Sequence, residues 1–213
     1  MIAEASRESL RTAGTLLAFA AAGTALLAFT FALTRPIIAR TEEEAKLALI
    51  AQVLPGKPYD NDLLRDAVEL APAPELGTSE AGRAYRARLQ GRPAAVVLEA
   101  VAPDGYSGRI RLLIAIRADG EVAGVRVVAH RETPGLGDYI EAAKSDWIDG
   151  FRGRSLDRPP SGEWKVRKDG GQFDYMAGAT ITPRAVVRAV RQALEYYSQH
   201  REQLFAPATG EGR

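Results

Sequence analysis

The chain has 213 residues, and its 28 Lys and Arg against 27 Asp and Glu give a formal net charge of +1. Because both signs are spread through the chain, the composition argues against the long-range positive field that nucleic-acid-binding proteins use, and no nucleic acid is expected as a partner. The absence of cysteine excludes disulfides, iron–sulfur clusters, thiolate zinc sites and cysteine nucleophiles in this chain.

An uncharged apolar segment runs from Thr12 to Thr34, after a short N-terminus of residues 1–11. As a helix it would span roughly 35 Å, enough to cross a bilayer core of about 30 Å. A cleaved signal peptide is the alternative, but its apolar part is usually about 7 to 15 residues long. The pattern therefore predicts an uncleaved transmembrane helix over 12–34. The basic residues at its two ends do not decide its orientation.

Residues 35–80 are predicted to connect this helix to a folded domain through helices and a proline-rich loop. Thr41 opens a capping box, which predicts a second helix that ends at the Pro-Gly pair 55–56. Prolines then surround a short apolar run, Leu63 to Leu70, which favours a loop enclosing one short helix.

Residues 81–200 have the pattern of a single domain. Alternating apolar residues and β-branched side chains predict an antiparallel meander of four strands, AYRARLQ (84–90), AAVVLEAVA (94–102), RIRLLIAIR (109–117) and EVAGVRVVAH (121–130). The pair Asp119-Gly120 indicates a tight hairpin turn between the last two.

The rest of this domain is predicted to be helical with short strands. A short helix is expected between Tyr139 and Phe151, and segments 164–166 and 173–176 are candidate strands. A longer helix from Pro183 to about His200 has apolar residues at helical spacing and needs a sheet to cover. The expected fold class is α+β, with a mainly antiparallel sheet packed by helices and a flexible tail over 201–213.

Three loops are candidates for a ligand site. In AGATITPRAV, Thr182 suits an N-cap and Pro183 the first helical position, so Thr180 would lie two residues before a helix whose free N–H groups attract anions. Gly178 and Ala179 leave the backbone open to a large group. A glycine turn into a capped helix, with no ligand, explains the same residues.

The other two loops are HRETPGLG (130–137) and PDGYSG (103–108). His130 and Glu132 would give a metal ion only two ligands, which is too few, so no metal site is expected. The glycines of the first loop suit the edge of a flat ligand or a simple turn. Tyr106 is either the exposed tip of a hairpin or a side chain that stacks on an aromatic ring.

Taken in order behind a membrane helix, GYSG, HRETPGLGD, WIDGFRG and DYMAGATITPRAVVRAV resemble the FMN-binding domain of the G subunit of Rnf-type ion-translocating electron-transport complexes. The resemblance covers the chain from about Thr12 to Tyr197. It implies that FMN is joined through its phosphate to the hydroxyl of Thr180, by a separate flavin transferase that uses FAD. Ala177 stands where that family usually has serine or threonine.

The resemblance also implies the surroundings of the cofactor. The residues expected near the phosphate and the attachment point are Asp174, Gly178, Ala179 and Thr182. Those expected against the flavin ring are Tyr106, Glu132, Thr133, Leu136 and Gly137. Thr180 is then a modified acceptor that carries a phosphoester, not a catalyst, and the chain contributes no catalytic residue of its own.

By this resemblance the chain is an electron-transfer flavoprotein subunit without independent turnover. Its implied partners are the other membrane, iron–sulfur and flavin subunits of the complex. The implied location is the bacterial inner membrane, with residues 1–11 in the cytoplasm and the domain in the periplasm. The alternatives are a protein like the C subunit of the sodium-pumping NADH:quinone reductase, an anchored ligand- or partner-binding domain without redox function, and a hydrolase that uses Thr180.

Overall fold

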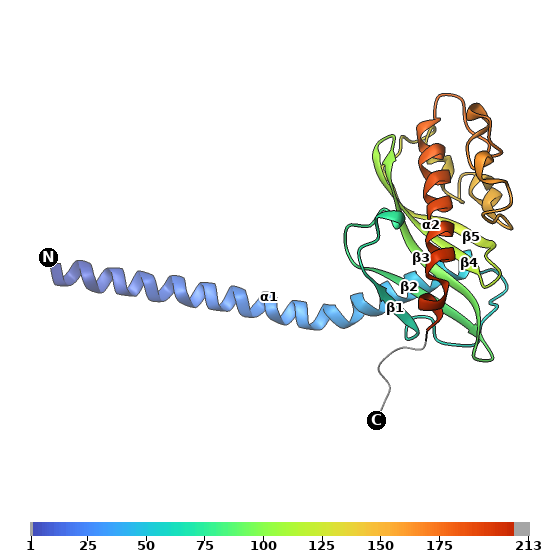
Figure 1. The fold of residues 1–213 in the computed structure, drawn as a ribbon. Coiled ribbons are helices and arrows are strands. Elements are labelled where there is room, and N and C mark those ends of the chain that lie inside the picture. The colour runs from blue at the N-terminus through green and yellow to red at the C-terminus, as the bar shows by residue number, and fades with distance from the viewer. Residues whose placement is uncertain (1, 207–213) are drawn as a thin grey trace. The chain divides into compact units, whose positions relative to one another are not determined.

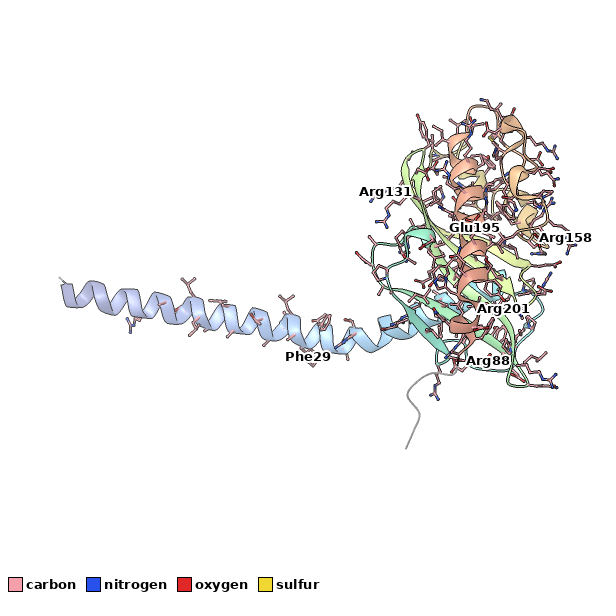
Figure 2. All side chains as sticks on the ribbon, in the orientation of Figure 1. Phe29, Arg88, Arg131, Arg158, Glu195 and Arg201 are labelled. Carbon is pink, nitrogen blue, oxygen red and sulfur yellow. The ribbon has the colours of Figure 1, made fainter. Side chains whose placement is uncertain are left out.

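The computed structural model describes residues 2–206, the side chains of residues 2–10, 12, 36–40, 42 and 43 excepted, and the chain divides after Lys46 into two compact units. Helix α1 runs over Ile2–Val53. It contains the 23-residue segment Ala13–Arg35, whose mean hydropathy of 2.1 and length suit a membrane crossing. Phe29 is one of the apolar side chains exposed along this segment (Figure 2).

The prediction of a separate helix beginning at Thr41 is wrong, because α1 is continuous from the apolar segment to Val53. Pro36 lies inside this helix. A proline removes one backbone donor, but the hydrogen bonds on either side of it can carry a helix onward. The predicted end of the helix, just before Pro55 and Gly56, is confirmed.

The second unit contains one antiparallel sheet in the order β1-β2-β3-β4-β5 (Figure 1). Its strands are β1 Ala67–Leu70, β2 Gly82–Leu89, β3 Arg92–Gly105, β4 Gly108–Arg117 and β5 Val122–Ala129. The predicted four-strand meander is therefore confirmed as β2 to β5. In the β4–β5 turn, Gly120 has a φ of +90° and its N–H donates to the Arg117 carbonyl at 2.9 Å.

Helix α2, Ile181–Phe205, covers one face of this sheet (Figure 1). Alternate residues of β3, such as Val96 and Leu98, pack with the apolar side chains of α2 in the main core. The residues between them, such as Val97, form a smaller core on the opposite face with Ile50 and Val53 from the end of α1. The alternation of a strand thus supplies both cores, which confirms the α+β class.

Several local predictions differ from the structure. Residues 201–205, predicted to belong to a flexible tail, continue helix α2 to Phe205, and residues 207–213 of that predicted tail lie outside the described residues. The run 63–70 contains no helix but a turn followed by β1, which exists because Ala67–Leu70 pairs with β2. Segments 164–166 and 173–176 do not join the sheet, and a single bridge links Val166 to Phe173. The expected short helix is two 3₁₀ turns, η2 Asp138–Ile140 and η3 Asp146–Phe151. Further 3₁₀ turns are η1 Pro74–Leu76, η4 Ser161–Glu163 and η5 Arg167–Asp169.

Candidate functional site

The buried carboxylate of Glu132 joins the three loops that the sequence marked as candidates. Its side chain is 4% exposed. Oε1 accepts a hydrogen bond from the backbone N–H of Ser107 at 2.9 Å, and Oε2 accepts one from the hydroxyl of Thr182. One carboxylate therefore ties the β3–β4 hairpin and the first turn of α2 to the loop that follows β5. Figure 1 shows this hairpin at the end of the domain where α2 begins.

The carboxylate of Glu132 fits between the loops because Gly105 and Gly137 have no side chain. A Cβ on Gly105 would lie 2.9 Å from Oε1 of Glu132, and a Cβ on Gly137 would lie 3.0 Å from Oε2 and 2.9 Å from the Thr182 hydroxyl. All three distances are shorter than normal contacts. The absence of a side chain at these two positions is therefore a condition for the three loops to meet.

Helix α2 begins two residues earlier than the sequence predicted. Ile181 is its first residue and Thr180 its N-cap, whereas Thr182 and Pro183 lie inside the first turn. The prediction of Thr182 as N-cap is wrong because its hydroxyl donates to Glu132. Within residues 2–206, the partly exposed hydroxyl of Thr180 makes no capping hydrogen bond. Thr180 thus presents an unengaged hydroxyl at the positive end of the α2 dipole.

A tight turn precedes Thr180. The N–H of Ala179 donates to the carbonyl of Met176 at 3.0 Å, and Gly178 has a φ of +88°. Glycine adopts this left-handed conformation at little cost, whereas a residue with a side chain would be strained. Ala177 and Gly178 are both exposed, so the turn leaves open space directly before the hydroxyl.

Two aromatic side chains hold the segment before this turn, and no sequence motif signals this role. The indole Nε1–H of Trp147 donates to the carbonyl of Asp174 at 2.8 Å. The N–H of Met176 donates to the hydroxyl of Tyr139 at 3.4 Å. Burial raises the pKa of Tyr139 to about 12, so this hydroxyl keeps its proton at neutral pH.

The loop after β5 turns on itself and is fixed by charge pairs. The N–H groups of Leu136 and Gly137 donate to the carbonyl of Thr133 at 3.1 and 3.0 Å. Lys144 contacts the carboxylate of Asp138 at 2.5 Å. The hydrogen bond from Lys144, with a further one from the Gly135 backbone, lowers the pKa of Asp138, and the same contact raises the pKa of Lys144.

The candidate residues of the sequence divide into three groups in space. Gly178, Ala179 and Thr180 lie at the turn before α2. Asp174 precedes this turn, and its carboxylate forms an ion pair with Arg167 at 2.8 Å. Glu132, Gly137 and Thr182 make the buried junction, so the carboxylate of Glu132 is occupied by protein donors. Thr133 and Leu136, like Tyr106 on the hairpin, are exposed.

Exposed apolar side chains are concentrated around this end of α2. Five large ones on the three loops and the first turn of α2 are 38–68% exposed: Tyr106, Leu136, Tyr175, Met176 and Ile181. Outside α1, in the part of the chain that the structure describes, the other large apolar side chains with this exposure are Leu89 and Val128, and neither lies on these loops. Most of the large exposed apolar side chains of the domain thus lie on the three candidate loops and the first turn of α2.

The described residues place neither a metal-binding cluster nor a histidine base beside Thr180. Among the described residues, no group of three or more histidines and carboxylates is placed to hold a metal ion. His130 accepts the N–H of Glu132 on Nδ1 at 3.0 Å, so Nε2 carries the proton that bonds to Glu141 at 2.8 Å. His200 bonds to the Tyr196 carbonyl at 3.0 Å. Within residues 2–206, neither histidine hydrogen-bonds to Thr180 as a hydrolase would require.

Comparison with known proteins agrees with this geometry. Residues 105–195 match the family model of an FMN-binding domain, and residues 1–53 match the model of the RnfG N-terminal region. The G subunit of the ion-translocating oxidoreductase complex of Pseudomonas aeruginosa is 49% identical over 212 residues, which are 100% of this chain and 99% of the relative. The G subunit of the Vibrio cholerae complex is 48% identical over 197 residues, 92% of this chain and 94% of the relative.

A crystal structure of the C subunit of the Na(+)-translocating NADH-quinone reductase from Parabacteroides distasonis is also similar, with a TM-score of 0.42, 22% identity and 69% of each chain covered. The fold and the matched models define a class of protein, an FMN-binding domain behind one apolar helix. Within that class, the chain belongs to the family of G subunits of ion-translocating oxidoreductase complexes. This family confirms the resemblance seen in the motifs and decides against the alternative of a reductase C subunit.

Proposed function

We propose that this chain carries FMN covalently attached through its phosphate to Thr180, and that it relays electrons within an ion-translocating oxidoreductase complex. The observation that carries the proposal is the position of Thr180. Thr180 is the N-cap residue of α2, its hydroxyl makes no capping hydrogen bond within residues 2–206, and it lies two residues before Thr182, where three loops distant in sequence meet on Glu132.

The start of α2 suits a phosphate. The first N–H groups of a helix have no partner within the helix, and with the helix dipole they bind anions. Ile181 and Thr182 offer these groups beside Thr180, and the open turn at Gly178 leaves room for the phosphate oxygens. Asp174 is turned toward Arg167, which keeps its negative charge compensated near this site.

The exposed apolar side chains suit a flavin ring. Tyr106 and Leu136 come from two of the loops, and their exposure gives a flat aromatic ring apolar surface to cover. Thr133 belongs to the same loop as Leu136 and is exposed, whereas Gly137 shapes this loop, because its N–H donates to the Thr133 carbonyl at 3.0 Å. Glu132 acts beneath these contacts, because its carboxylate holds the loops together.

Attachment is a group transfer for which this chain supplies the acceptor. The Thr180 oxygen forms a bond to the FMN-side phosphorus of FAD, the bond between the two phosphates breaks, and AMP leaves. The hydroxyl proton passes to a base. A threonine hydroxyl is a weak nucleophile at neutral pH, so the base belongs to a separate flavin transferase. The site of this chain then only presents the hydroxyl and receives the phosphate.

FMN supplies the redox chemistry, and the protein sets its position and its potential. The apolar helix Ala13–Arg35 anchors the domain in the bacterial inner membrane beside the other subunits of the complex. The domain belongs on the periplasmic side, where a covalent link prevents loss of the cofactor: even nanomolar affinity, about 12 kcal/mol, permits slow release. A C-terminal reporter that is active only in the periplasm tests this orientation, and activity only of a cytoplasmic reporter would contradict it.

The proposal is tested by co-expression of the full chain with a flavin transferase, followed by denaturing electrophoresis under ultraviolet light. A fluorescent band is expected for the wild type and for Thr182→Ser, which keeps the hydroxyl that bonds to Glu132. A colourless wild-type band of unmodified mass would refute covalent attachment.

A further inference from the structure

The segment 174–179, here called the acceptor loop, is exposed except at Ala179. Within it, the N–H of Ala179 closes the turn on Met176. In the described part of the chain, its backbone makes two hydrogen bonds to groups outside the loop, and both go to aromatic side chains. Trp147 donates to the Asp174 carbonyl at 2.8 Å, and Tyr139 accepts from the Met176 N–H at 3.4 Å.

These two side chains form a rigid support, here called the aromatic shelf. Their rings meet edge to face with centroids 5.5 Å apart, and Trp147 meets the fully buried Phe151 in the same way at 5.4 Å. Ser145 locks the pair, since its hydroxyl donates to the Tyr139 carbonyl at 2.7 Å and accepts the Trp147 N–H at 3.2 Å. The shelf thus transmits the rigidity of the core to the acceptor loop.

We propose that Trp147 and Tyr139 are positioning residues, which hold the acceptor loop so that the Thr180 hydroxyl is presented to the flavin transferase. This inference rests on the proposed attachment at Thr180. Ordering a free loop costs conformational entropy at every residue, and a loop that the shelf has already ordered avoids part of that cost when the transferase binds. A displacement of about 1 Å at a reacting group can cost about a hundredfold in rate.

The chain offers a matched control for Trp147. Trp164 belongs to the same aromatic cluster, with its centroid 5.1 Å from that of Phe173, and its Nε1–H also donates to a backbone carbonyl, that of Ser155, at 3.2 Å. Trp147→Phe and Trp164→Phe each remove one indole donor and keep an aromatic ring. Only the first removes a hydrogen bond to the acceptor loop.

The full chain in detergent is mixed with purified transferase and excess FAD, and the initial rate of flavin attachment is measured against acceptor concentration. Loss of one hydrogen bond to the loop is expected to lower kcat/KM of Trp147→Phe about tenfold. Trp164→Phe is expected to keep kcat/KM within about twofold of wild type, although its unfolding midpoint should be the lower of the two because Trp164 is buried and Trp147 is only partly buried. Equal rates for the two variants, or rates that simply follow the unfolding midpoints, would overturn the inference.

Amide hydrogen exchange on the unmodified chain separates this inference from the proposed function. Exchange over residues 174–179 is expected to accelerate in Trp147→Phe and in Tyr139→Phe, and to stay at the wild-type rate in Trp164→Phe. If the wild-type chain accepts no flavin, the proposed function fails while exchange still reports on the shelf. If the wild type accepts flavin and exchange is the same in all three variants, the shelf fails and the proposed function stands.

Discussion

The hydroxyl of Thr182 donates a hydrogen bond to the buried carboxylate of Glu132, although 50 positions separate the two residues. This contact fastens the first turn of α2 to the loop after β5, and the second oxygen of the same carboxylate fastens the β3–β4 hairpin through Ser107. The position of Thr180 at the start of α2 therefore depends on the hydrogen bonds of Glu132 to Thr182 and Ser107, although within residues 2–206 Thr180 itself makes no hydrogen bond to Glu132.

Removing the Thr182 hydroxyl tests the strength of this junction. Thr182→Val keeps the shape of the side chain but leaves Oε2 of Glu132 buried without its donor, which costs about 1 to 3 kcal/mol. The free energy of unfolding, measured by denaturant titration of the detergent-solubilised chain, is expected to fall by that amount. Thr182→Ser retains the donor and is expected to lose much less. Equal losses for the two variants would show that the hydroxyl contributes nothing.

Gly137→Ala is expected to loosen the same junction by steric conflict. The new Cβ would lie 2.9 Å from the Thr182 hydroxyl and 3.0 Å from Oε2 of Glu132. Overpacking of this kind costs about 1 to 3 kcal/mol and should lower the unfolding midpoint in a thermal scan. Gly162→Ala is the control, because a Cβ there meets no atom within 4 Å. A midpoint for Gly137→Ala equal to that of the control would contradict the packing described for the site.

The buried hydroxyl of Tyr139 predicts a pH dependence at alkaline pH. Burial raises its pKa to about 12, whereas an unfolded tyrosine has a pKa of about 10. The folded state therefore favours the protonated form, and this stabilisation is complete below about pH 10 and is lost as the pH rises through about 12. The difference in unfolding free energy between wild type and Tyr139→Phe should change across this window and stay constant below it. A difference independent of pH up to about 12 would contradict the burial.

Replacing Ala177 with serine is expected to increase the rate of flavin attachment. Ala177 is exposed in the turn before Thr180, at the position where the resemblance described under Sequence analysis implies serine or threonine. An added hydroxyl there meets solvent, so Ala177→Ser should leave the unfolding midpoint unchanged. It should raise the initial rate of flavin attachment, because a hydroxyl beside the phosphate can donate a hydrogen bond to it. A rate equal to or below that of wild type would show that this position does not limit attachment.

The sequence predicted the parts of the fold that depend on local pattern. Strands β2 to β5 are rich in apolar and β-branched residues and are separated by turns that contain glycine, so the sequence predicted both these strands and their order. Strand β1 has four residues and forms only because Ala67–Leu70 finds β2 as a partner. The capping-box pattern at Thr41 predicted the start of a second helix, whereas α1 continues through this position from the apolar segment.

The site was predictable where its residues form contiguous motifs, and not where it depends on contacts across the chain. Thr182 before Pro183 looks like an N-cap, and only the contact with Glu132 explains why the helix begins at Ile181. The hydrogen bond from Trp147 to Asp174 joins positions 27 apart. The motif WIDGFRG, which begins at Trp147, supported the family resemblance but did not predict this contact.

The most direct test of flavin attachment is the intact mass of the full chain after co-expression with a flavin transferase, with peptide mapping of the modified residue. We expect a mass gain equal to FMN less one water, located on Thr180. Thr180→Val is expected to abolish the gain while the unfolding midpoint stays close to wild type, because the Thr180 hydroxyl makes no capping bond within residues 2–206. An unmodified wild-type mass, or a gain that persists in Thr180→Val and maps to Thr182, would contradict attachment at Thr180.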